Sequence, residues 1–134
     1  MKIIMVRGCS DTGKTTTLKK VRDFLWTEGR IKEGGKVPES DCDIWAIIEY
    51  RGKTIGLLTM GDYSNKVLEY AKEFRVGYHC DWFICACNSG FTRPIGLLQD
   101  SEAGIFLRKE NPDDADEKRI LDVIKNILDD EILG

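Results

Sequence analysis

Residues 2–17 read Lys2-Ile3-Ile4-Met5-Val6-Arg7-Gly8-Cys9-Ser10-Asp11-Thr12-Gly13-Lys14-Thr15-Thr16-Thr17. The apolar run at residues 2–6 predicts a buried strand, and the helical spacing of later apolar residues predicts a helix over residues 16–28. Gly8 and Gly13 bracket the turn between them, where glycine supplies backbone angles and close approaches that a Cβ would block. The remaining elements and the candidate site are predicted relative to this unit of strand, glycine-rich turn and helix N-terminus.

The turn has the spacing G-x-x-x-x-G-K-[ST], from Gly8 to Thr15, which is typical of a loop that binds phosphate. Backbone N–H groups in such a turn form a concave anion site, and the helix dipole adds partial positive charge. Lys14 can reach the β and γ phosphates, the Thr15 hydroxyl can ligate Mg²⁺, and Thr16 can reach the α-phosphate. Asp11 would repel phosphate oxygens, so it must point outward, pair with a cation or contact a substrate. The predicted nucleotide-binding residues are Gly8, Cys9, Ser10, Asp11, Thr12, Gly13, Lys14, Thr15 and Thr16.

Over residues 3–17, and more weakly near residues 55–62, the chain resembles the P-loop NTPase superfamily. The resemblance is to the superfamily and to no particular subfamily. It implies a nucleoside triphosphate and Mg²⁺ as ligands, and a phosphate loop at the carboxyl edge of a parallel sheet.

The remaining pattern alternates strands with helices and predicts a single α/β domain over residues 1–134. Glycine in the turn at residues 51–53 predicts an antiparallel hairpin. Residues 30–42 are polar and contain Gly34, Gly35 and Pro38, so they predict a mobile loop. We expect a three-layer P-loop NTPase-like fold whose mostly parallel central sheet carries one antiparallel edge strand from the hairpin. Predicted strands cover residues 44–50, 54–59, 82–87 and 104–109; predicted helices cover residues 65–74 and 112–131; residues 88–103 are expected to be irregular, with a short helix at 94–98.

A second acid is needed to hold Mg²⁺ through its water shell. Asp62 is the predicted residue, because the strand at residues 54–59 should lie beside the first strand and end at the same sheet edge as the loop. Gly61 precedes it where a bulky apolar residue is usual, and the alternative is a simple turn into the next helix. Glu49 is a weaker candidate, since it lies within the hairpin.

Transition-state charge on the γ-phosphate usually requires a further cation. Arg93 is the predicted residue, and Arg30, Lys32 and Lys36 are rivals from the expected mobile loop. Asn65 is a candidate for orienting an attacking water. The predicted catalytic residues are Lys14, Asp62 and Arg93, and the predicted metal ligands are Thr15 and Asp62.

Cysteines gather near one predicted strand. Cys85 and Cys87 share one face of it, with His79 and Cys80 just upstream. The C-x₂-C pairs of zinc sites are missing and the strand is apolar, so we expect buried thiols that act as small hydrophobic groups. Cys9 lies near a helix N-terminus, where the pKa of a thiol tends to fall, so it is expected to be sensitive to oxidants.

Composition narrows the class of protein. The chain has 134 residues, 42% of them hydrophobic and 32% charged, as is ordinary for a soluble globular protein. No apolar run approaches the roughly 20 residues that span a bilayer. The five cysteines are an odd number without secretory features, which favours reduced thiols in the cytoplasm. A net charge of −3 argues against a general nucleic-acid or anionic-membrane binder.

The order of elements is similar to that of small GTPases, but the guanine-reading Asn-Lys-x-Asp is missing after the late strand, which ends Asn88-Ser89-Gly90-Phe91. ATP is therefore the expected ligand by default. The main hypothesis is an ATPase or nucleotide-dependent switch that contacts a protein partner through residues 30–42 or 88–103. The alternatives are a small kinase that transfers the γ-phosphate and a protein that binds nucleotide without hydrolysing it. Enzymatic activity is thus a hypothesis, and the oligomeric state is not indicated.

Overall fold

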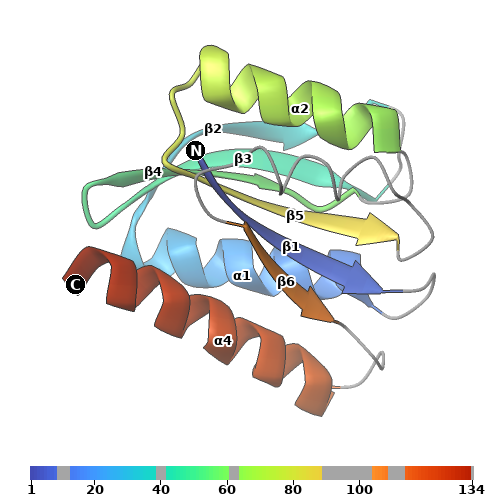
Figure 1. Ribbon diagram of the computed structural model, residues 1–134, viewed down its shortest axis with the longest axis vertical. Coiled ribbons are helices and arrows are strands. Elements are labelled where there is room, and N and C mark those ends of the chain that lie inside the picture. The colour runs from blue at the N-terminus through green and yellow to red at the C-terminus, as the bar shows by residue number, and fades with distance from the viewer. Residues whose placement is uncertain (9–12, 39–41, 61–63, 89–103, 109–113, 134) are drawn as a thin grey trace.

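The structure is a computed structural model that describes residues 1–8, 13–38, 42–60, 64–88, 104–108 and 114–133 (Figure 1). Strands and helices alternate along most of the chain, as the α/β expectation requires. The elements follow in the order β1 (Lys2–Gly8), α1 (Lys14–Glu28), β2 (Arg30–Lys36), β3 (Ile44–Tyr50), β4 (Lys53–Leu58), α2 (Ser64–Val76), β5 (Trp82–Asn88), β6 (Gly104–Arg108) and α4 (Asp114–Leu133). The short helix expected at residues 94–98 lies outside the described residues.

The strands form one six-stranded mixed sheet with the order β2-β3-β4-β5-β1-β6. Parallel ladders join β4 to β5, β5 to β1 and β1 to β6, whereas β3 pairs antiparallel with both β2 and β4. The expected mostly parallel sheet with one antiparallel edge strand is therefore wrong. The antiparallel strand β3 lies inside the sheet because β2 covers its outer side. The expected neighbour of β1 is also wrong, since β5 lies between β1 and β4.

Strand β2 replaces the mobile loop that was expected over residues 30–42. Its side chains are exposed or half-buried, so it lacks the alternating apolar pattern that would identify it. Backbone pairing with β3 holds it instead, from Arg30 opposite Glu49 to Lys36 opposite Ile44. Where Gly35 lies opposite Trp45, an added Cβ would come within 3.3 Å of the indole nitrogen, so the aromatic ring covers the glycine.

The hairpin between β3 and β4 is confirmed. Its two turn residues, Arg51 and Gly52, have φ values of 47° and 81°. Positive φ at both positions is typical of the type I′ turn that joins antiparallel strands by two residues. The turn sends β3 and β4 in opposite directions, and this decides where the first residues of β3 lie.

Helices cover both faces of the sheet: α1 and α4 lie on one face and α2 on the other (Figure 1). The face under α1 and α4 buries alternate strand residues such as Ile4 and Val6 against Leu18, Val21 and Leu25 of α1. The face under α2 buries the intervening residues, such as Ile3 and Met5. The buried apolar residues of the described helices are Leu18, Val21, Leu25, Val67, Ala71, Phe74, Ile120, Ile124 and Leu128.

Polar contacts fix α4 against its neighbours. The buried Tyr50 donates a hydrogen bond from its hydroxyl to Asp129 Oδ1 at 2.9 Å, so the end of β3 is tied to the helix. Lys20 of α1 forms an ion pair with Glu117, whose carboxylate is largely buried. None of the helices in the described part of the chain combines the length and apolar character needed to cross a membrane.

Gly29 ends α1 in an extended conformation, with φ −136° and ψ −151°, rather than in a left-handed cap. A Cβ at this position would lie 2.3 Å from the Glu49 carbonyl oxygen and 2.9 Å from that of Leu25. Glycine is therefore required by the close approach of two backbones.

Replacing Gly29 with alanine should lower the free energy of unfolding by about 2 kcal/mol or more, because backbone atoms must move to admit the methyl group. Gly52→Asn is the matched control, since nothing lies within 4 Å of a Cβ at Gly52 and asparagine tolerates positive φ. The control should cost less than about 1 kcal/mol. Urea denaturation of both variants checks this, and equal costs would contradict the role given to Gly29.

Candidate functional site

The predicted phosphate loop is bounded by the two glycines that the motif requires. Gly8 is the last residue of β1 and lies at the carboxyl edge of the parallel strands. Gly13 precedes α1 with φ 81° and ψ 25°, a left-handed conformation that favours glycine. The first helical hydrogen bond runs from Thr17 N to Gly13 O at 3.0 Å, and Gly13, as the N-cap residue, has no side chain to accept a hydrogen bond from the helix. Among the described residues, the N–H groups of the first turn of α1 therefore have no side-chain cap.

Lys14 folds back over the start of the loop. Its Nζ donates a hydrogen bond to the Gly8 carbonyl oxygen at 3.1 Å. The residue is only 7% exposed, so this lysine is buried and not a solvated surface side chain. The contact holds the ammonium group at the point where the chain leaves β1, so a positive charge and the α1 N-terminus share one location.

A buried carboxylate lies beside the predicted metal ligand. Asp43, which is 5% exposed, accepts hydrogen bonds on Oδ1 from the Thr15 hydroxyl at 3.1 Å and the Thr59 hydroxyl at 2.8 Å. Thr59 Oγ1 in turn accepts the Ile44 N–H at 2.9 Å. One carboxylate oxygen of Asp43 therefore joins the N-terminus of α1, the start of β3 and the residue that follows β4.

Sequence reasoning missed Asp43, which falls between the loop expected over residues 30–42 and the strand expected over residues 44–50. The predicted hairpin would have indicated that Asp43 lies near the loop. A strand antiparallel to β4 begins at the edge where β4 ends, and β4 was expected to end at the edge that holds the loop. Trp45 pairs with Leu58 in the ladder, so the residue just before Ile44 must lie near Thr59.

Thr15 and Asp43 supply hydroxyl and carboxylate oxygens, the ligands that Mg²⁺ prefers. In the described residues, no group of three or more His, Cys, Asp or Glu side chains could hold a metal. A large protein cage is not needed, since Mg²⁺ in nucleotide sites keeps several waters and uses one or two carboxylates together with phosphates. This donor pair fits a magnesium ion that is shared with a phosphate ligand.

The pKa of the Cys87 thiol depends on charged groups at the end of the neighbouring strand β1. Burial raises the pKa of its thiol, while the positive charges of Arg7 and Lys14 oppose that rise. Arg7 pairs with Cys87 in the ladder between β1 and β5. Two positively charged side chains, Arg7 and Lys14, are thus close enough to Cys87 to act on its thiol at the carboxyl edge of the sheet.

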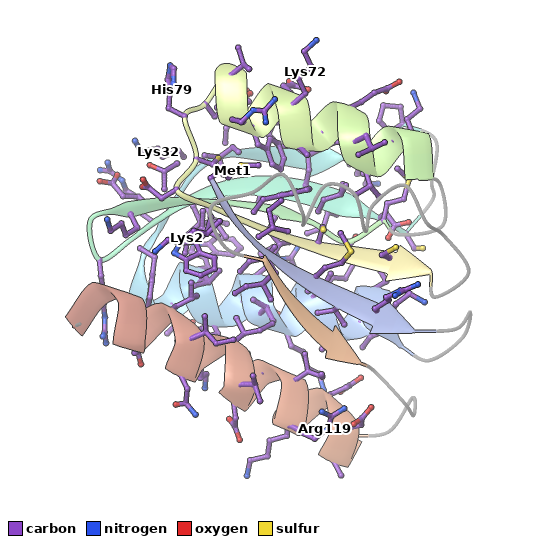
Figure 2. The ribbon with its side chains drawn as sticks, viewed as in Figure 1. Met1, Lys2, Lys32, Lys72, His79 and Arg119 are labelled. Atoms are coloured by element: carbon purple, nitrogen blue, oxygen red, sulfur yellow. The ribbon has the colours of Figure 1, made fainter. Side chains whose placement is uncertain are left out.

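The structure places some predicted alternatives at the wrong edge. Glu49 pairs with Arg30 at 3.1 Å and with Lys32 at 3.7 Å, where β2 and β4 begin. Figure 2 shows Lys32 on the same side as Met1 and Lys2, away from the carboxyl ends of β1 and β5. The expectations for Glu49, Arg30 and Lys32 are therefore wrong, because these residues lie at the edge opposite the loop.

Two more of the predicted site residues, Lys36 and Thr16, lie in the described part of the chain. Lys36 ends β2 at the loop edge and is exposed, and Thr16 is exposed on the first turn of α1. Asp62 and Arg93 lie outside the described residues, as does the side chain of Asn65. The loop residues Cys9, Ser10, Asp11 and Thr12 also lie outside them.

The expected burial of the strand cysteines is confirmed. Cys85 and Cys87 are fully buried in the apolar cluster under α2, and Cys80 is 5% exposed. Burial raises the pKa of Cys80 to about 12 and that of Cys85 well above its usual value. His79 has a positive φ of 55° and is exposed. These thiols are part of the core packing.

Comparison of the chain with protein-family models, with curated proteins and with solved structures gives no match in any of the three.

The cysteines should differ sharply in their reactivity with iodoacetamide at pH 8. Cys42 is exposed and should be alkylated in the native protein, whereas Cys80, Cys85 and Cys87 should react only after unfolding, because their raised pKa values keep them protonated. Peptide mass spectrometry assigns each site, with Cys42→Ser as the control. Native labelling of Cys80 as fast as that of Cys42 would contradict the described burial.

Proposed function

We propose that the chain binds a nucleoside triphosphate, with ATP preferred to GTP, and hydrolyses it in the presence of Mg²⁺. It would act as a small ATPase or nucleotide-dependent switch of the P-loop type, with a three-layer α/β fold. The observation that carries this proposal is the joint placement of Lys14, Thr15 and Asp43 at the carboxyl end of β1, where Lys14 contacts Gly8 and Thr15 contacts Asp43.

Each of these groups has a counterpart in the chemistry of phosphate. The N-terminus of α1 and the Lys14 ammonium supply positive charge for a polyphosphate, and the left-handed Gly13 would suit a loop whose backbone N–H groups bind it. Lys14 is held by a carbonyl at 3.1 Å, a contact that a phosphate oxygen can replace or share. This set of donors favours an anion with several oxygens over a single carboxylate.

Thr15 and Asp43 are the proposed magnesium ligands. When bound, Mg²⁺ would neutralise charge on the β and γ phosphates. The Thr15 hydroxyl can donate a hydrogen bond to Asp43 Oδ1 while a lone pair of its oxygen faces the ion. The 3.1 Å hydrogen bond would thus orient Thr15 as a metal ligand. Asp62, expected from the sequence, stays a second candidate for this role, and Arg93 stays the candidate cation for the γ-phosphate.

A switch needs a connection from the site to the surface, and the chain offers one. Val37 is buried and directly follows β2, and its N–H donates to the Asp43 carbonyl oxygen at 3.0 Å. A shift of Asp43 toward a bound metal would therefore move the end of the exposed edge strand β2. We propose that residues 30–42 carry the nucleotide state to a protein partner.

Lys14→Ala should weaken ATP binding and hydrolysis by roughly 100-fold or more, because it removes a positive charge beside the phosphates. Lys53→Ala, an exposed lysine at the start of β4 and the opposite edge, should leave both unchanged. Calorimetric titration with ATP and Mg²⁺ checks the affinity, and circular dichroism checks the fold. Equal affinity in wild type and Lys14→Ala would refute the nucleotide site, and ADP release that requires an added acceptor would indicate a kinase.

Asp43→Asn separates the metal role from the structural role. The amide oxygen can still accept both threonine hydroxyls, so the thermal midpoint should change little, while the Mg²⁺ concentration for half-maximal hydrolysis should rise at least about tenfold. Asp43→Ala should also cost about 1–3 kcal/mol of stability, because two buried hydroxyls lose their acceptor. Asp81→Asn, at the far edge, is the control. An unchanged Mg²⁺ requirement in Asp43→Asn would move this role to another residue.

A further inference from the structure

Strand β2 is one of the two outermost strands of the sheet, and within the described part of the chain its outer side is not paired with another strand. The N–H of Val37, the next residue along the chain, points inward, because it donates to the Asp43 carbonyl oxygen. Backbone groups of an antiparallel strand alternate in direction, so Gly35 also points toward β3, while Gly34 and Lys36 point outward. The backbone N–H and C=O groups of Gly34 and Lys36 are therefore directed to the outer side of β2.

The outer side of β2 is accessible to a second chain. Every residue of β2 except the half-buried Ile31 is exposed, and at Gly34 the backbone itself is exposed, since glycine has no side chain. The register with β3 shifts between Ile31 and Glu33, so the regular part of the strand runs from Glu33 to Lys36. An unpaired strand of this kind can take up an extended peptide by β-strand addition, in which the peptide becomes the next strand of the sheet.

An exposed aromatic residue adjoins the start of this strand. Trp26 is 59% exposed and belongs to the last turn of α1, just before β2. Thr15 and Trp26 are about three helical turns apart, so they lie on the same side of α1. Because Thr15 contacts Asp43 at the start of β3, this is the side of α1 that faces β3 and β2. Ile31 of β2 packs on the same face of the sheet as α1, so an added strand would meet two apolar side chains there.

The charge of β2 indicates the chemistry of the partner. The strand carries three cations, Arg30, Lys32 and Lys36, and one carboxylate, Glu33. Arg30 and Lys32 share the single carboxylate of Glu49. The strand therefore keeps an excess of positive charge along its accessible side, which favours a partner with acidic side chains.

A second copy of this chain fits the outer side of β2 less well than an acidic peptide does. Two antiparallel copies of β2 would bring Arg30, Lys32 and Lys36 of one copy close to the same cations of the other, and like charges on neighbouring strands are destabilising. Lysine on an outermost strand commonly protects a sheet against such pairing. The same cations attract an acidic strand, so they select between the two partners.

We infer that β2 binds an extended acidic segment of a partner protein by β-strand addition, with backbone hydrogen bonds to Gly34 and Lys36 and an apolar side chain of the partner against Trp26. The inference deepens the proposed function, on which it rests for the presence of a partner at residues 30–42. Val37 directly follows the strand and bonds the Asp43 carbonyl oxygen, so peptide binding at β2 and metal binding at Asp43 would be coupled.

The test titrates the full chain in a calorimeter with a synthetic peptide of about nine residues that alternates glutamate and valine. Wild type should bind this peptide at least about tenfold more tightly than a peptide that alternates lysine and valine, because of the charge of β2. The glutamate peptide with every backbone nitrogen methylated keeps its side chains and its charge but cannot donate backbone hydrogen bonds. Its dissociation constant should be at least about tenfold higher.

Variants of β2 separate the backbone from the charge. Lys36→Pro removes an outward N–H group and places a ring on the outer side, so it should raise the dissociation constant for the glutamate peptide at least about tenfold. Lys36→Gln removes only the charge and should raise it by up to about fivefold. Trp26→Ala should raise it at least about threefold. Lys72→Gln is the control for a lost charge, because Lys72 is exposed on α2 (Figure 2), and it should bind the peptide as wild type does.

The inference would be overturned by equal affinity of wild type for the methylated and unmethylated peptides, a comparison that decides even if Lys36→Pro does not fold. Equal affinity of wild type and a folded Lys36→Pro would also overturn it. Dimerisation of wild type that Lys36→Pro abolishes would identify a second copy as the occupant, and tighter binding of an oligothymidylate than of the peptide would identify a nucleic-acid surface; either result overturns the inference.

The same titrations, repeated with Mg²⁺ and a non-hydrolysable ATP analogue, keep the inference distinct from the proposed function. The affinity for the peptide should change at least about twofold when the analogue is bound, because of the coupling through Val37 and Asp43. Failure of the analogue to bind wild type would overturn the proposed nucleotide site, whereas loss of the peptide alone would overturn strand addition.

Discussion

A single carboxylate oxygen, Oδ1 of Asp43, joins the helix that follows the loop to two strands of the sheet. Its hydrogen bonds reach the Thr15 hydroxyl at 3.1 Å and the Thr59 hydroxyl at 2.8 Å, and Thr59 accepts the Ile44 N–H. Asp43 and Thr59 are buried, and in such surroundings a network strengthens each of its bonds and makes the loss of any member costly. The first turn of α1 is thereby held in register with the carboxyl edge of the sheet. The placement of Lys14 depends on that same turn.

Two backbone features bring these groups together. Gly13 adopts a left-handed conformation, so the chain can reverse between the loop and α1. Arg51 and Gly52 form the turn that returns β4 antiparallel to β3, so the first residue of one strand lies beside the end of the other. Both are local conformations with sequence signatures, yet their joint effect is a contact between residues 15 and 43. The polar groups of the site are thus positioned by turn geometry and not by their neighbours in sequence.

The sequence predicted the features whose signals are local. The bounds of β3 were predicted to the residue, and α1 begins two residues before its predicted start. Both predictions used apolar periodicity and nearby glycines, which are signals that span only a few residues. Strand β2 was missed, since Lys32, Gly34 and Gly35 carry no strand pattern and pairing with β3 alone makes the segment extended. Asp43 was missed because its role depends on topology. The roles given to Asp62 and Arg93 stay predictions.

The hydrogen bond from Val37 to Asp43 has a consequence for how this protein can vary. It joins the two ends of the short connection between β2 and β3. The position of Asp43 in the site is therefore fixed by this hydrogen bond and not by the connection itself. The entropy of closing a loop grows only slowly with its length. The connection can therefore accept inserted residues, or an entire grafted peptide, while Asp43 and Thr15 keep their mutual geometry.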